Sequence, residues 1–153
     1  MSRYFVTGAT GFLGSELVKQ LVGRGHRVVA LVRTPEKARV LQAIGVELHT
    51  GDITDRTTLR APMAGVDGVF HVAAWYKVGV NGPQADQVNV DGTRNVLKVM
   101  GDLGITRGVY TSTVAVFSDT RGAVPDETYR YDGPHLSHYE RTKWLAHYRV
   151  ALP

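Results

Sequence analysis

The segment Thr7-Gly8-Ala9-Thr10-Gly11-Phe12-Leu13-Gly14 places three glycines directly after a β-type run and directly before a helical pattern. The run covers Arg3–Val6, and apolar residues from Phe12 to Val22 recur at helical spacing. Glycines at such a turn let the backbone approach a pyrophosphate, while the first turn of the helix supplies free N–H donors. The segment therefore predicts a dinucleotide site, and the alternative is a tight turn without a ligand.

The rest of the chain repeats this alternation of β and α patterns. Further β-type runs cover Arg27–Val32, Val46–Thr50, Val69–Ala73 and Val109–Thr113. Helical patterns run from Pro35 to Gly45, from Asp55 to Met63, from Val88 to Leu103, and onward from Leu136, while Trp75–Pro83 and Ser118–Pro134 have the glycines and prolines of loops. Alternating units predict the α/β class, here a Rossmann-type doubly wound parallel sheet of about five strands with helices on both faces. Ligands of such sheets bind beyond the carboxyl ends of the strands.

The composition indicates one globular domain over residues 1–153, since 43% of the residues are apolar and 21% are charged. The chain has no cysteine, which excludes a disulfide scaffold, a thiolate metal site and a thiol nucleophile. We find no apolar run long enough to span a membrane and no signal-peptide pattern, so we expect a cytoplasmic protein. The net charge is +4, but the basic residues are spread along the chain, so no nucleic-acid partner is expected.

The residues after the second and third β-type runs indicate which dinucleotide binds. Arg33 stands where folds that prefer NAD usually have an acid. A guanidinium suits a 2′-phosphate through paired charge-assisted hydrogen bonds, so Arg33 predicts NADP as cofactor, with NAD as the alternative. A solvated surface arginine is the other interpretation. Asp52 could accept a hydrogen bond from the adenine amino group, with the backbone of Ile53 beside it, or could only form the first turn of a helix.

Tyr139 and Lys143 are four residues apart, so both side chains should lie on one face of a helix. A tyrosine hydroxyl is a poor base because its reference pKa is about 10, and a nearby ammonium lowers that pKa by favouring the phenolate. The spacing is common by chance and gains weight only from the other motifs. Tyr110-Thr111-Ser112-Thr113 adds hydroxyl groups at the end of the fifth β-type run, where one could bond a substrate carbonyl oxygen.

Three histidines are candidates for other roles. His135 and His138 are three residues apart, but no carboxylate or third histidine is spaced to complete a metal site, so no metal is expected. His71 lies in an apolar run and is expected to be a hydrogen-bonded interior residue.

Taken in order, these motifs resemble the extended type of the short-chain dehydrogenase/reductase superfamily, the NAD-dependent epimerase/dehydratase family. The resemblance implies that Tyr139 is the general acid/base and that Thr113 hydrogen-bonds the same substrate oxygen. Lys143 would lower the pKa of the tyrosine and bind the nicotinamide ribose. Asn89, in Asn89-Val90-Asp91-Gly92-Thr93, would be structural or part of a water relay. The implied cofactor-binding residues are Gly8, Thr10, Gly11, Phe12, Leu13, Gly14, Arg33, Asp52, Ile53, Ala73, Ala74 and Lys143.

Within this family, Arg33 and Trp75-Tyr76 look more like the dihydroflavonol-reductase-like carbonyl reductases than the sugar-nucleotide epimerases. The resemblance thus implies an NADP(H)-dependent oxidoreductase that interconverts a carbonyl and an alcohol of a small-molecule substrate by hydride transfer. The alternatives are a nucleotide-sugar epimerase or dehydratase with NAD, and a noncatalytic dinucleotide-binding module.

The resemblance also implies a further C-terminal portion and a dimeric partner. Members of the family continue beyond the Tyr-x-x-x-Lys helix, so we expect the C-terminal substrate-binding portion to be absent from residues 1–153. Val109–Thr113 would then be an exposed edge strand, which is a pairing liability. In the family the helices that carry Asn89 and Tyr139 pack against their mates, which implies a homodimer.

Overall fold

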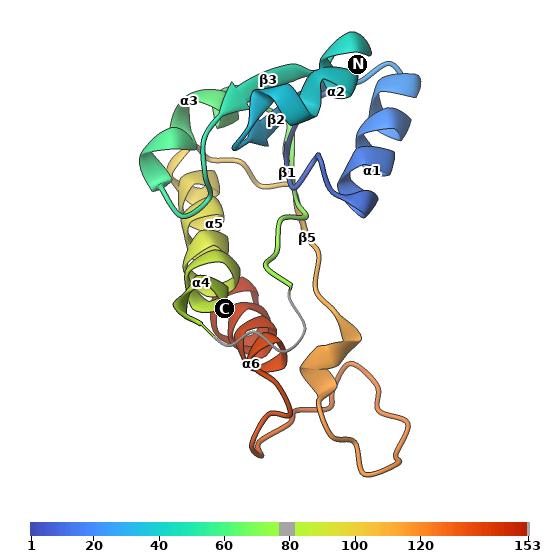
Figure 1. Ribbon diagram of the computed structural model, residues 1–153, viewed down its shortest axis with the longest axis vertical. Coiled ribbons are helices and arrows are strands. Elements are labelled where there is room, and N and C mark those ends of the chain that lie inside the picture. The colour runs from blue at the N-terminus through green and yellow to red at the C-terminus, as the bar shows by residue number, and fades with distance from the viewer. Residues whose placement is uncertain (77–81, 153) are drawn as a thin grey trace.

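The computed structural model describes residues 1–76 and 82–152. Its strands are β1 (Arg3–Thr7), β2 (Arg27–Val32), β3 (Glu47–Thr50), β4 (Gly68–His71) and β5 (Gly108–Tyr110). All neighbouring strands are parallel, and their order in the sheet is β3-β2-β1-β4-β5. Figure 1 labels β1, β2, β3 and β5. The chain therefore winds from β1 to one edge and then to the other, which confirms the Rossmann-type doubly wound fold and places a topological switch between β1 and β4.

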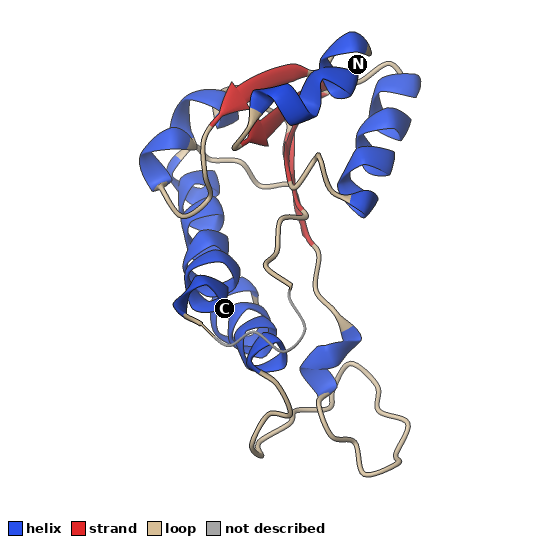
Figure 2. Cartoon of the chain, viewed as in Figure 1, coloured by secondary structure: helices blue, strands red, loops and turns tan. Residues whose placement is uncertain are grey.

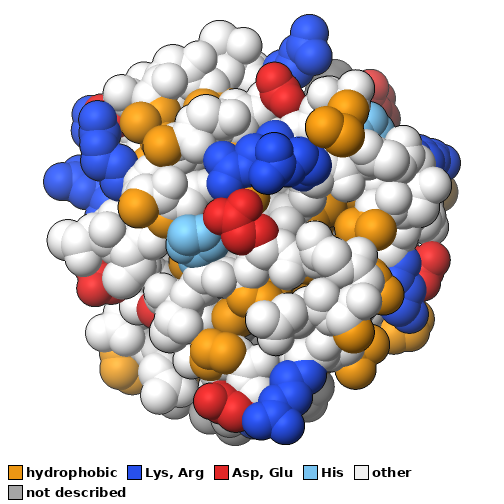
Figure 3. Space-filling model, turned by 90° about the horizontal axis from the view of Figure 1, so that it is seen from above, with side chains coloured by type: hydrophobic (Ala, Val, Ile, Leu, Met, Phe, Trp, Pro, Cys, Tyr) orange, Lys and Arg blue, Asp and Glu red, His pale blue; other side chains and the backbone are white. Residues whose placement is uncertain are grey.

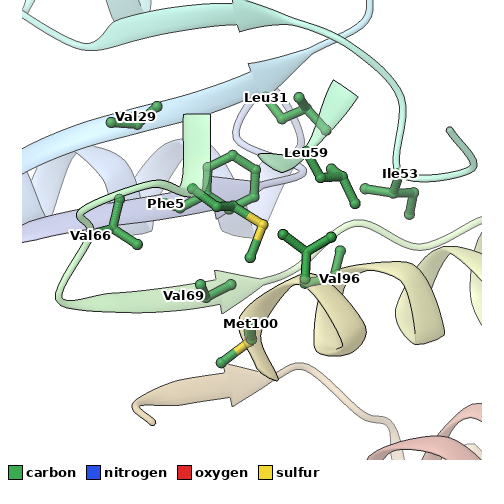
Figure 4. Close-up of a cluster of buried hydrophobic side chains, with 11 residues drawn as sticks. Phe5, Val29, Leu31, Ile53, Leu59, Val66, Val69, Val96 and Met100 are labelled. Carbon is green, nitrogen blue, oxygen red and sulfur yellow. The ribbon is translucent and has the colours of Figure 1, made fainter. Parts of the chain in front are cut away.

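Each face of the sheet has its own hydrophobic core. Along β1, Phe5 packs into one cluster and Val6 into the other, because successive side chains of a strand point to opposite faces. Helices α1 (Phe12–Gly23) and α2 (Arg39–Ala43) contribute to the cluster of Val6. Helices α3 (Arg60–Met63) and α5 (Thr93–Asp102) cover the face that Figure 4 shows, where Met100 lies near Val69. Helices thus cover both faces, as the apolar run in β2 predicts.

The connections after β2 and β3 are less regular than the helical patterns predict. The segment after Pro35 is a 3₁₀-helix, Pro35–Ala38, followed by the short helix α2. The segment after Asp55 is likewise a 3₁₀-helix, Arg56–Thr58, followed by α3. Asp55 caps this segment as predicted, since its carboxylate accepts a hydrogen bond of 3.0 Å from the backbone N–H of Thr57.

The two helices of the C-terminal half begin and bend differently from the prediction. The helix expected from Val88 starts earlier, as α4 (Pro83–Ala85), and continues through a π-helical segment, Asp86–Gly92, into α5. Helix α6 (His138–Leu145) is followed by a second π-helical segment, Ala146–Ala151. Residues 77–81 of the loop expected at Trp75–Pro83 lie outside the described residues, and Pro83 itself opens α4. The loop from Ser118 to Pro134 is irregular as predicted (Figure 2).

Strand β5 is shorter than the predicted Val109–Thr113. It pairs only with β4, which ends at His71, so the last bond of this ladder runs from the Thr111 N–H to the His71 carbonyl (3.0 Å). Beyond it, Thr113 caps the 3₁₀-helix Val114–Phe117 and turns the chain away from the strand direction. The expectation of an exposed edge is confirmed, since β5 ends the sheet and Val109 is 55% exposed.

The remaining expectations concern the distribution of basic side chains on the surface and the presence of a membrane-spanning helix. On the face seen in Figure 3, Lys and Arg side chains lie in several separate groups, with acidic and neutral side chains between them. In the part of the chain that the structure describes, no helix has the length and apolarity that a membrane span requires.

Candidate functional site

A cleft with a volume of about 400 Å³ lies between the glycine turn and the segments that follow β2, β3 and β4. All the predicted cofactor-binding residues except Lys143 line it, namely Gly8, Thr10, Gly11, Phe12, Leu13, Gly14, Arg33, Asp52, Ile53, Ala73 and Ala74. They come from four different turns of the chain. The doubly wound topology brings these turns to one edge of the sheet, at the switch between β1 and β4.

The glycine turn is built so closely that side chains would not fit. Gly8 has a φ of +73°, and a Cβ there would lie 2.7 Å from the backbone nitrogen of Ala73. A Cβ on Gly14 would overlap the carbonyl oxygen of Gly8. The backbone of β1, the first turn of α1 and the segment after β4 therefore approach one another at a distance that only glycine permits.

The first turn of α1 offers unpaired donors beside this turn. Gly11 is its N-cap residue and has no side chain that could accept from the first N–H groups of the helix. Thr10 is exposed at the tip of the turn, Phe12 is 98% exposed and Leu13 is 54% exposed. The cleft wall thus combines free N–H donors with apolar surface, which suits a phosphate group attached to an organic ligand.

Arg33 and Asp52 stand at the ends of β2 and β3. Arg33 is exposed and makes no hydrogen bond or ion pair with any described residue. One carboxylate oxygen of Asp52 accepts from the N–H and from the hydroxyl of Thr54, both at 2.9 Å. The Ile53 side chain is buried, and its carbonyl accepts from Asn95 at 2.9 Å. Asp52 therefore does form a helix-entry turn, and this turn also fixes its carboxylate at the cleft.

Lys143 lies on α6, directly behind the cleft. Its ammonium donates to the carbonyl of Thr111 at 2.9 Å and lies 4.6 Å from the centre of the Tyr110 ring. Thr111 itself lines the cleft. The side chain is buried and has no carboxylate partner among the described residues, so burial lowers the pKa of Lys143 to about 8.

Tyr139 and Thr113 come together as the motifs predict. Burial raises the pKa of Tyr139 above its usual value, while the Thr113 hydroxyl beside the phenol lowers it and the neighbouring Tyr76 raises it. The Tyr76 ring packs edge-on against the Tyr139 ring with centroids 4.8 Å apart. The lowered pKa that we expected is not found in this structure, because the Lys143 ammonium lies against the Thr111 carbonyl and the Tyr110 ring instead.

Asn89 lies in the π-helical segment and is 2% exposed. Its side-chain oxygen accepts from the Trp75 N–H at 2.7 Å, and its amide nitrogen donates to the Trp75 carbonyl at 3.1 Å and to the Thr142 hydroxyl at 3.0 Å. Asn89 therefore joins the segment after β4 to helix α6, which fits the structural role that the resemblance implies.

The histidines behave differently from one another. His71 is buried and hydrogen-bonded on both ring nitrogens, as expected for an interior residue. His138 contacts Asp86 at 2.9 Å, and His135 packs against the ring of Trp144. Among the residues that the structure describes, no group of three or more His, Cys, Asp and Glu side chains could hold a metal ion.

Two contacts of the site went unnoticed in the sequence, although it had drawn attention to the residues that make them. Thr111 provides a cleft wall and the acceptor for Lys143, and Tyr76 packs against Tyr139. The pairing of His71 with Tyr110 in the parallel ladder could have located Thr111, because it aligns the residues that follow β4 and β5. No local pattern indicates the contact of Tyr76.

Comparison with known proteins identifies reductases among the relatives of this chain. It is 39% identical over 142 residues to a 4-hydroxy-2-methyl-3-oxo-4-farnesyl-3,4-dihydroquinoline-1-oxide ketoreductase from Stigmatella aurantiaca, a match that covers 92% of this chain and 42% of the relative. It is 40% identical over 156 residues to a 2-alkyl-3-oxoalkanoate reductase from Stenotrophomonas maltophilia, covering 97% of this chain and 45% of the relative. The chain thus spans less than half the length of these curated relatives.

Among solved structures, a UDP-glucose-4-epimerase from Stenotrophomonas maltophila with bound NAD and formylated UDP-arabinopyranose superposes with a TM-score of 0.85 at 26% identity. The alignment covers 99% of this chain and 48% of the epimerase chain. The family model described as "NAD dependent epimerase/dehydratase family" matches residues 4–151. The resemblance inferred from the ordered motifs is therefore confirmed, and the chain belongs to the NAD-dependent epimerase/dehydratase family.

Proposed function

We propose that residues 1–153 are the cofactor-binding part of an NADP(H)-dependent oxidoreductase that interconverts a carbonyl and an alcohol by hydride transfer. The observation that carries this proposal is the cleft that the glycine turn, Arg33, Asp52 and Thr111 line together, with Lys143 bonded to the carbonyl of Thr111 behind it. The reductase relatives support the reaction class, because their identities of 39% and 40% exceed the 26% of the epimerase structure. The substrate-binding portion would lie outside these residues.

The residues present fit a dinucleotide, since the backbone cradle at Gly8 and Gly14 would be filled by any Cβ and borders free helix N–H groups. These N–H groups would hold the pyrophosphate, Arg33 the 2′-phosphate and Asp52 the adenine amino group. Lys143 would donate to the nicotinamide ribose. The cofactor, when bound, would supply or accept the hydride.

Side chains of this chain would donate and orient the proton that the reaction needs at the substrate oxygen. Because burial raises the pKa of Tyr139, the phenol keeps its proton at neutral pH. It can therefore donate this proton to the substrate oxygen during carbonyl reduction. Thr113, whose hydroxyl lies beside the phenol, would hydrogen-bond the same oxygen and hold it in line.

Substitution of Arg33 tests the choice of cofactor. The variant Arg33→Ser should raise the Kd for NADPH roughly ten- to hundredfold, since it removes hydrogen bonds to a charged phosphate, and should leave the Kd for NADH unchanged. Fluorescence titration with each nucleotide measures both constants. Arg27→Ser is the matched control, because Arg27 is an exposed arginine at the opposite end of the same strand. Equal losses for NADPH and NADH would contradict the proposed role of Arg33.

The epimerase structure supports a second candidate, a nucleotide-sugar epimerase or dehydratase with tightly held NAD. NAD that remains in the purified protein would favour this candidate, and its absence together with NADPH preference would favour the reductase. If the chain is a noncatalytic module, Tyr139→Phe should leave any biological activity intact. A homodimer in the cytoplasm belongs to the same proposal, and sedimentation at low concentration tests the dimer.

A further inference from the structure

Five of the polar side chains buried in the described residues are connected by hydrogen bonds, with the backbone carbonyl of Asn89 as one of the links. They are at most 2% exposed and belong to Thr7, His71, Asn89, Thr93 and Thr142. His71 is at the centre of the set. Its Nδ1 lies 2.7 Å from the Thr7 hydroxyl, and its Nε2 lies 3.0 Å from the Thr93 hydroxyl.

The partners of the two hydroxyls fix which ring nitrogen carries the proton. The Thr7 hydroxyl accepts from the Ala73 N–H at 3.2 Å, which leaves its own proton for His71 Nδ1. The Thr93 hydroxyl donates to the Asn89 carbonyl at 2.6 Å, so it accepts from His71 Nε2–H. The Thr93 contact requires a proton on Nε2, and a neutral imidazole with its proton there gives every one of these groups a partner, the Thr7 hydroxyl proton included. Burial agrees with this state, since it lowers the pKa of His71 to about 3.

The set connects the two halves of the candidate site. Thr7 directly precedes Gly8 of the glycine turn, at the end of β1. At the other end, the Asn89 amide donates to the Thr142 hydroxyl at 3.0 Å. That hydroxyl in turn donates to the Tyr139 carbonyl at 3.0 Å, inside helix α6. The bonds therefore run from the dinucleotide cradle through β4 and α5 to the helix that carries Tyr139 and Lys143.

We propose that His71 is a positioning residue, which as a neutral Nε2–H imidazole holds the α5–α6 unit in register with strand β4 and so sets Tyr139 and Lys143 against the cofactor cleft. The expected effect of His71 on cofactor binding rests on the proposed function. The effect of His71 on how α5 and α6 are held against β4 does not depend on that function. His71 touches neither substrate nor cofactor in this role and acts through Thr93 and Asn89.

The tautomer is tested directly on the wild-type chain without any ligand. The ¹⁵N NMR shifts of the His71 ring should show a protonated Nε2 and a bare Nδ1 from pH 7 down to pH 5. An Nδ1–H tautomer or an imidazolium in this range would overturn the proposal. This measurement does not depend on whether any variant folds.

Two substitutions separate the two bonds of the ring. In His71→Gln the side chain is long enough to donate to Thr93 but has no acceptor at the Nδ1 position, whereas in His71→Asn it can accept from Thr7 but cannot reach Thr93. Hydrogen exchange of the α6 amides should accelerate about tenfold in His71→Asn and less than threefold in His71→Gln, because only the first change removes the bond from β4 to Thr93. His49→Asn, at a histidine of β3 outside this set, is the matched control.

Ligand binding distinguishes positioning from general damage. Adenosine 2′,5′-bisphosphate contacts only the cradle side of the cleft, while NADPH also reaches Lys143 under the proposed function. His71→Asn should weaken NADPH about tenfold, the worth of one hydrogen bond, and leave the bisphosphate within twofold of wild type. The positioning role would be overturned if His71→Asn and His71→Gln changed exchange and binding equally. It would also be overturned if His71→Asn weakened NADPH and the bisphosphate equally. If the wild type binds neither ligand, the proposed function fails, and the exchange and tautomer measurements still decide the role of His71.

Discussion

Helices α1 and α6 carry the two sides of the candidate site, and their first turns are completed in opposite ways. Gly11 begins α1 without a side-chain cap. At α6, the Ser137 hydroxyl accepts from the Glu140 N–H at 3.1 Å, and the Glu140 carboxylate accepts from the Leu136 N–H at 3.0 Å. Helix α1 thus leaves its N–H groups for a ligand, while α6 satisfies its own and presents side chains instead. The uncapped start suits an anion, and the capped start stabilises the helix that carries Tyr139 and Lys143.

The largest expected effect comes from closing the backbone cradle of α1. Gly14→Ala places a methyl group against the Gly8 carbonyl, so the helix must move away from β1. We expect the free energy of unfolding to fall by about 1–3 kcal/mol and NADPH binding to be lost. Urea unfolding and fluorescence titration measure the two effects.

Gly23→Ala is the control in the same helix, since a Cβ on Gly23 meets nothing within 4 Å. It should leave binding unchanged and raise stability slightly, because alanine favours a helix more than glycine does. Comparable losses in the two variants would mean that the close approach at Gly14 is unimportant.

Acid should lower the stability of the fold through His71. Its pKa is about 3 in the folded state against an ordinary 6.5, so the unfolded chain binds more protons between these values and stability falls as the pH is lowered through this range. From pH 6.5 to pH 5 this one group should cost roughly 2 kcal/mol. The difference between wild type and His71→Gln in unfolding free energy, followed over this range, isolates it. A difference that does not change with pH would contradict the buried neutral state.

Lys143 should lower stability at neutral pH, because its ammonium is buried without a carboxylate partner among the described residues. We expect Lys143→Met to raise the free energy of unfolding by about 1–2 kcal/mol at pH 7 and to weaken NADPH roughly tenfold. The folded pKa of about 8 lies below the ordinary 10.5, so the gain should shrink as the pH rises between these two values. Denaturation at pH 7 and pH 10 tests the sign, and a gain that grows with pH would refute it.

The smallest expected effect concerns the cap of α6. Ser137→Ala should cost about 1 kcal/mol of stability, since the Glu140 N–H loses its acceptor. Ser15→Ala, in the first turn of α1, is the control and should change stability by no more than about 0.5 kcal/mol, because the Ser15 hydroxyl is no cap. Thermal unfolding of both variants makes the comparison. Similar changes would show that the two helix starts do not differ in the way described.

The α1 side of the molecule could be predicted from the sequence because its determinants are local. The glycines at 8, 11 and 14 lie within one turn of the chain, and the unbroken apolar run Val28–Val32 identifies a strand buried on both faces. Once the strands are ordered, every residue that follows them arrives at the same edge of the sheet. The lining of the cleft by Arg33 and Asp52 follows from this order alone.

The α6 side could be predicted only in part because its determinants are distant in the sequence. Thr7 and His71 are 64 residues apart, and Asn89 and Thr142 are 53 apart, so no spacing rule relates them. The acceptor of the Lys143 ammonium is a backbone carbonyl, which carries no sequence signal. The early end of β5 likewise depends on where its partner β4 ends.

The hydrogen bonds between Ala73 and Asn89 all run in one direction. The chain of bonds starts at a backbone N–H, which can only donate, and ends at a backbone carbonyl, which can only accept. A proton can hop along hydrogen-bonded groups only if every member can reverse its role, and here the two ends cannot. The interior of the sheet is therefore closed to proton conduction along this path, from the Ala73 N–H to the Asn89 carbonyl.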